Sequence, residues 1–127
     1  MSSPAKGKQV QNLLETFQQR NPEVVMAIAA TTDGFSVASV SNGLHVQDEA
    51  ALAVAAARIL DMATEVNKQL QQGEIGRILI EGSRHTTIAV SAGTQIALIV
   101  TLPAKAKLGL AMVGIQSTAA AIAQVYQ

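Results

Sequence analysis

The residues best suited to acid-base or metal chemistry in this chain are His45, Asp48 and Glu49. An imidazole near two carboxylates could hold a metal ion weakly. A solvated loop is the simpler interpretation of His45, because polar residues surround it. Asp48 and Glu49 immediately precede a helix-patterned segment, where the helix dipole favours negative charge. We therefore predict a structural role for this group and no metal site.

A second carboxylate pair, Asp61 and Glu65, lies within the same helix-patterned segment. Arg58 and Lys68 share its helical face, at spacings of three and four residues that favour ion pairs on a helix surface. We interpret the four residues as a solvated polar strip. If the protein binds another protein, this strip of Arg58, Asp61, Glu65 and Lys68 is a candidate contact surface.

The glycine and serine patterns do not match known catalytic motifs. Gly109 and Gly114 have phosphate-loop spacing, but Ile115 and Gln116 follow where lysine and a hydroxyl residue are needed. Ser36 follows Gly34 without the second glycine of a nucleophile elbow. The chain has no cysteine, which removes thiol catalysis and thiolate metal sites. We predict a protein that is not an enzyme and has no cofactor.

Composition limits the classes of partner. Nine basic and nine acidic residues cancel, and there are only three aromatic residues, so a nucleic-acid partner is not expected. Hydrophobic residues make up 49% and charged residues 14%, so much of the surface is expected to be covered. Residues 1–8 read as a flexible tail without a signal peptide, which favours the cytoplasm. The apolar segment Leu108 to Tyr126 is interrupted by polar residues and carries an amphipathic stripe, so it is not expected to span a membrane.

Periodicity predicts one domain over residues 9–127. A first helix ends near Pro22, and an Asp33-Gly34 pair joins two strand-like runs as a hairpin. A long helix over Asp48 to Leu70 follows, then three strand-like runs and a last helix. The most apolar runs, beginning at Val24 and Gln95, are expected in the middle of the sheet. We predict an α+β fold in which a five-stranded antiparallel sheet lies between the long helix and the two terminal helices.

The long helix is apolar on two sides. One stripe is expected to cover the domain's own sheet: Leu52, Ala55, Ala56, Ile59, Ala63, Val66 and Leu70. The other is left for a second chain: Ala50, Ala53, Val54, Ala57 and Leu60. One domain of this length cannot surround a helix, so we predict a partner chain and expect Leu60→Glu to give a monomer or an aggregate. The strand Ile78-Leu79-Ile80 would also be an aggregation hazard unless it is paired.

The chain resembles the Roadblock dynein-light-chain family, and within it the prokaryotic MglB-like members. The resemblance rests on Ala29 to Ser39 followed by Glu49 to Ala56, on Gly73 to Gly82, and on Ala106 to Leu110. It covers about Leu13 to Tyr126.

The resemblance implies a homodimer joined through the long helices and the third strands into one continuous sheet. Carried over by position, the contacts would include Ala50, Ala53, Ala57 and Leu60, with Gly76, Arg77, Ile78, Leu79 and Ile80 pairing along the edge. It also implies a non-catalytic regulator or scaffold that binds a Ras-like small GTPase. Stimulated GTP hydrolysis would come from repositioning of the GTPase's own residues. The competing mechanism is an arginine supplied in trans, from Arg58 or Arg84.

Two other functions stay open. One is a structural adaptor of the motor light-chain type, whose binding ignores the nucleotide on its partner. The other is a small-ligand sensor with a pocket between sheet and helix.

Overall fold

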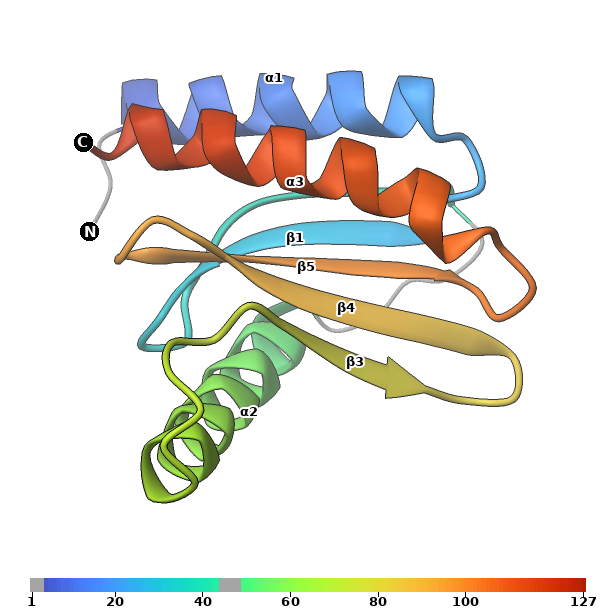
Figure 1. Ribbon diagram of the computed structural model, residues 1–127. Coiled ribbons are helices and arrows are strands. Elements are labelled where there is room, and N and C mark those ends of the chain that lie inside the picture. Colours follow the sequence, from blue (N-terminus) through green and yellow to red (C-terminus); the bar gives the residue numbers. More distant parts are fainter. Residues whose placement is uncertain (1–3, 44–48) are drawn as a thin grey trace.

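The computed structural model describes residues 4–43 and 49–127, and it shows three helices and one five-stranded sheet (Figure 1). His45 and Asp48 lie outside the described residues. The elements in chain order are α1 (Pro4–Arg20), β1 (Met26–Thr31), β2 (Ser36–Ser41), α2 (Glu49–Gln69), β3 (Arg77–Glu81), β4 (His85–Ala92), β5 (Ile96–Pro103) and α3 (Leu108–Val125).

All strand pairs are antiparallel, and the strand order is β2-β1-β5-β4-β3. Helices α1 and α3 cover one face of the sheet and α2 lies on the other (Figure 1). The predicted α+β architecture is confirmed. So is the inner position of the two most apolar strands: β5 lies at the centre with β1 beside it.

Helix α1 begins at Pro4, so the prediction of a flexible tail is wrong for residues 4–8. Proline suits the first position of a helix because its missing N–H has no helical acceptor there. The first turn is also held from the side, because the Lys6 ammonium lies 5.4 Å from the centre of the Tyr126 ring. The basic, polar sequence of this turn does not predict a helix, yet the turn belongs to a helix that lies along α3.

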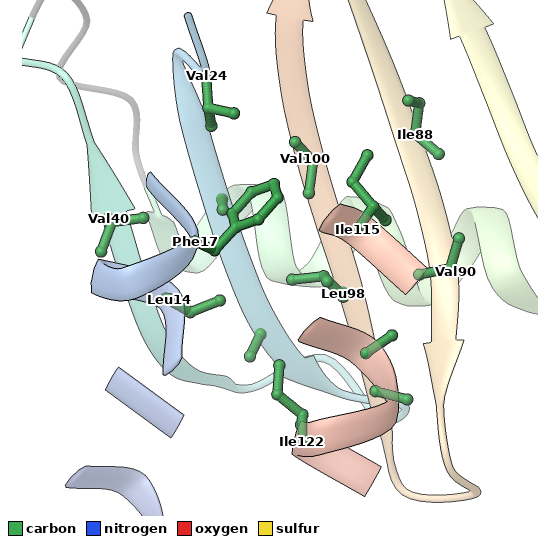
Figure 2. Packing of buried hydrophobic residues seen from close by; sticks show 14 of the residues in the cluster. Leu14, Phe17, Val24, Val40, Ile88, Val90, Leu98, Val100, Ile115 and Ile122 are labelled. Carbon is green, nitrogen blue, oxygen red and sulfur yellow. The ribbon is translucent and has the colours of Figure 1, made fainter. Parts of the chain in front are cut away.

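The main core fills the space between the sheet and the α1/α3 layer (Figure 2). Alternate residues of β5, Leu98 and Val100, point into it, and Leu14 of α1 and Ile115 and Ile122 of α3 pack on them. All five side chains are fully buried. This face is therefore largely covered within one chain.

The opposite face has a much smaller core. Ile28, Ala30 and Ala53 are its buried members, with Met26, Leu52 and Ile99 partly buried around them. Helix α2 packs mainly on β1 and β2. At the far edge of the sheet, Ile80 of β3 remains 45% exposed. A single chain therefore leaves the β3 side of this face incompletely covered.

Candidate interaction surfaces

The carboxylate at the start of α2 has a structural role. Glu49 accepts hydrogen bonds from the hydroxyl groups of Ser36 and Ser39, both on β2. These contacts fix the first turn of α2 over the sheet. Ser36, considered above as a nucleophile, therefore uses its hydroxyl to donate to the carboxylate at the start of α2.

The glycines with phosphate-loop spacing lie inside α3. A Cβ added to Gly114 would lie 3.1 Å from the Asn21 side-chain amide and 3.3 Å from the Phe17 ring, so this glycine allows α3 to approach α1 closely. Within residues 4–43 and 49–127, no three acidic or histidine side chains gather closely enough to hold a metal ion.

Helix α2 is rotated relative to the sequence prediction. The side chains that it buries against its own sheet are Ala53, Ala56 and Leu60. Ala53 has no exposed surface and Leu60 only 7%, so assigning these two residues to a partner contact is wrong. Ala57 does not face outward either, because it packs beside Gly34 in the β1–β2 turn. Small residues face the sheet because they let the helix backbone come close to it.

Larger apolar residues lie on a different side of α2, which we call the apolar flank. Its members are Leu52, Ile59, Met62, Val66 and Leu70. Leu52 of this flank and Ile99 of β5 both pack against the small core, whereas the opposite side of α2 packs beside the β1–β2 turn, so we place this flank on the side of α2 toward β5. Met62, Val66 and Leu70 are 71%, 46% and 65% exposed. The sequence prediction places Val66 and Leu70 in the domain core, because bulky apolar side chains usually mark the buried face of a helix. Met62 belongs to neither of the two predicted stripes.

Strand β3 forms the open edge beside that flank. Register places Ile78 opposite Ala89, Ala89 opposite Ile99, and Ile99 opposite Ile28, so these four residues share the face on which α2 lies. Leu79 points to the other face and is 40% exposed. An apolar edge strand with free backbone groups favours pairing with another strand.

The polar strip lies on the other side of α2 from the apolar flank. Arg58, Asp61, Glu65 and Lys68 are all exposed, as predicted for a solvated face. The Gln69 side-chain amide donates to Glu65 at 2.9 Å. Val54, one turn before Arg58, is 44% exposed and continues this side of the helix toward the β1–β2 turn.

The β1–β2 turn packs against this second side of α2. Gly34 has φ +104°, and a Cβ added to it would lie 3.5 Å from the Val54 Cα. A hydrogen bond from the Thr31 hydroxyl lowers the pKa of Asp33 below its ordinary value. Phe35 follows and is 68% exposed. The turn that packs against α2 therefore carries an exposed aromatic ring.

Helix α3 is long and apolar enough to cross a membrane, by length and composition alone. A helix of a soluble core passes the same test. Five of its residues are buried against the rest of the domain: Ala111, Met112, Ile115, Ala119 and Ile122. Leu110 and Val113 of the same helix are exposed.

One groove, of about 510 Å³, lies between α1 and α3. Its walls are amides, Thr16 and aliphatic residues, and no ionisable side chain lines it. This groove has no set of polar groups typical of an enzyme site.

Comparison with known proteins agrees with this geometry. The sequence pattern of the Roadblock/LC7 domain matches residues 10–102. No curated protein sequence matches the chain. Among solved structures, Myxococcus xanthus MglB has a TM-score of 0.89 at 13% identity, covering 99% of this chain and 93% of its own. The Thermus thermophilus gliding protein MglB has a TM-score of 0.85 at 18% identity, with coverages of 98% and 93%.

A structure described as MglB with a tetrameric arrangement has a TM-score of 0.86 at 19% identity, again covering 98% of this chain and 93% of its own. These likenesses establish the fold. The match of the domain pattern over most of the sequence establishes more: this chain belongs to the Roadblock/LC7 family.

Proposed function

We propose that this protein is a cytoplasmic, non-catalytic homodimer that binds a Ras-like small GTPase as a regulator or scaffold. Membership of a family of regulatory and adaptor proteins supports the general role. The observation that carries the proposal is the uncovered apolar surface formed by the apolar flank of α2 and the edge strand β3. A surface of this kind favours a protein partner over a small substrate.

The proposed dimer pairs β3 with β3 of a second copy along Gly76 to Ile80. A twofold axis at this edge would bring the two apolar flanks together, because each faces the half of the sheet that its own chain leaves uncovered. The partner's flank would then cover Ile78 and Ile80. This arrangement removes the open edge and the exposed apolar flank with one symmetric contact.

The polar strip stays outside this dimer and is the proposed contact surface for the GTPase. It offers charges of both signs and no acid or base poised for catalysis. Any stimulation of GTP hydrolysis would come from ordering the GTPase's own catalytic groups, since phosphoryl transfer depends mainly on positioning and charge stabilisation.

The test is direct binding of purified Ras-like GTPases encoded in the same genome, each loaded with GDP or with a non-hydrolysable GTP analogue. We expect one GTPase to bind with a preference for one nucleotide. Equal binding of both forms would favour the adaptor of the motor light-chain type. Absence of binding for every GTPase would contradict the proposal.

A further inference from the structure

Phe35 is the one aromatic side chain that is largely exposed among the described residues. It is 68% exposed, whereas Phe17 is 3% exposed and Tyr126 is half-buried. We infer that Phe35, with Val54 and Arg58 on the adjoining side of α2, is the anchor that holds the small GTPase proposed above. The inference rests on that proposed function and adds to it the residue that dominates the contact.

The backbone of Phe35 is held on both sides. Its N–H donates to the Thr31 hydroxyl at 2.9 Å, and its carbonyl accepts from the Thr31 N–H at 2.7 Å. The Gly34 N–H donates to the Thr31 carbonyl at 3.0 Å, which closes the turn. Because the base of the ring is fixed before binding, little backbone order is lost when a partner covers it.

Helix α2 supports the turn from below. Gly34 lies against Val54: a Cβ added to it would be in ordinary contact with the helix, 3.5 Å from the Val54 Cα, while its φ of +104° favours glycine in the turn. The turn and the helix therefore form one surface. Val54 is 44% exposed on it, and Arg58 follows one turn later.

The residue types fit a folded protein as the occupant. Aromatic residues and arginine are enriched where interfaces hold most of their binding energy. Arg58 is accompanied by Asp61 on α2, and Asp33 lies in the turn, so the patch has no excess of positive charge to attract a phosphate backbone or an anionic membrane. A protein with an apolar pocket inside a mixed polar rim complements it.

The patch would stay accessible in the proposed dimer. Leu52 packs against the small core beneath α2, as Ile99 of the central strand does, whereas Val54 packs beside the β1–β2 turn. These residues are on opposite sides of α2, so a second copy seated on the apolar flank leaves Phe35 uncovered. Each dimer would carry two such patches.

The test compares GTPase binding by the wild type, Phe35→Ala, Arg58→Ala and Leu110→Ala, measured by calorimetry on the dimeric protein. Leu110 is the matched control because it is 70% exposed on the other layer of the molecule. Phe35→Ala should weaken binding at least tenfold, and Arg58→Ala several-fold, with an unchanged oligomeric state. Leu110→Ala should change affinity less than twofold.

Unchanged affinity of Phe35→Ala, with a wild type that binds, would overturn this inference and leave the proposed function intact. So would a larger loss for Leu110→Ala than for Phe35→Ala. A wild type that binds no GTPase would instead overturn the proposed function, and this inference with it.

Discussion

The rotation of α2 can be tested by placing the same charge on three of its sides. Leu60 is 7% exposed beneath the helix, Val66 is 46% exposed on the apolar flank, and Val54 is 44% exposed on the side of the polar strip. Glutamate at each position should affect a different property: domain stability for Leu60, dimerisation for Val66, and neither for Val54.

The size of the Leu60→Glu effect follows from its burial. The variant loses about 2 kcal/mol of apolar burial. It also leaves a carboxylate under the helix without a partner, at a further cost of about 2 kcal/mol or more. A total of about 4 kcal/mol is a large part of the roughly 5–15 kcal/mol that holds a domain folded. We expect the thermal midpoint to fall by about 10–20 °C.

Val66→Glu should leave the domain folded and weaken the dimer. A twofold contact contains each substitution twice, so a cost of about 1.4 kcal/mol per copy raises the dissociation constant about a hundredfold. Light scattering at micromolar concentration gives the mass, and circular dichroism gives the helix content and thermal midpoint.

Val54→Glu is the control, because it makes the same substitution at nearly the same exposure. It should remain dimeric with a midpoint close to that of the wild type. A folded, monomeric Leu60→Glu together with a dimeric Val66→Glu would refute the orientation of α2 described above and restore the assignment made from the sequence. Equal dissociation by Val54→Glu and Val66→Glu would refute the division of α2 into two sides.

Three further predictions concern the domain itself. Leu98→Ala removes a fully buried side chain from the central strand, so urea unfolding should show a loss of about 3–5 kcal/mol. Glu49→Gln keeps the shape of the side chain but weakens its bonds to the two β2 hydroxyls, and the same measurement should show a loss of about 1–2 kcal/mol. Carboxyl NMR titration should place the pKa of Asp33 below the ordinary aspartate range, and Thr31→Val should raise it. The stabilisation from a lowered pKa is present above the unfolded-state pKa and is lost as pH falls through the folded-state value, so Thr31→Val should lessen this acid sensitivity.

The order of elements was predictable from the sequence because each has a local signal. Apolar runs of strand length marked β1 and β5, and the Asp33-Gly34 pair marked the hairpin between β1 and β2. The sheet position of β5 followed from its uniform apolarity, because only an inner strand is covered on both faces.

The orientation of α2 could not be predicted in the same way. Two apolar stripes on one helix satisfy periodicity equally well, and side-chain size favours the bulkier stripe for the core. The structure shows that two of the three residues that α2 buries are alanines, Ala53 and Ala56, which permit a close approach, and that Leu60 is the third. Side-chain size therefore does not predict which face of α2 is buried, because the helix lies close to small residues such as Ala30.

The first turn of α1 was missed for a related reason. Residues 4–8 contain two lysines and a glycine, which are typical of a solvated end, yet a helix forms where tertiary contacts support it. In the sequence Phe35 is simply one of three aromatic residues, which are too few for base stacking. Its exposure depends on the turn that carries it, and no periodic pattern contains that information.

The second half of α2 should make the helix content of the protein depend on its concentration. From Asp61 to Gln69 no side chain is buried, so within one chain these turns have almost no tertiary support. A helical segment of this length is marginal in water by itself. Its helicity should therefore rise with protein concentration as chains associate, and dilution should fray α2 from its carboxyl end before the sheet unfolds.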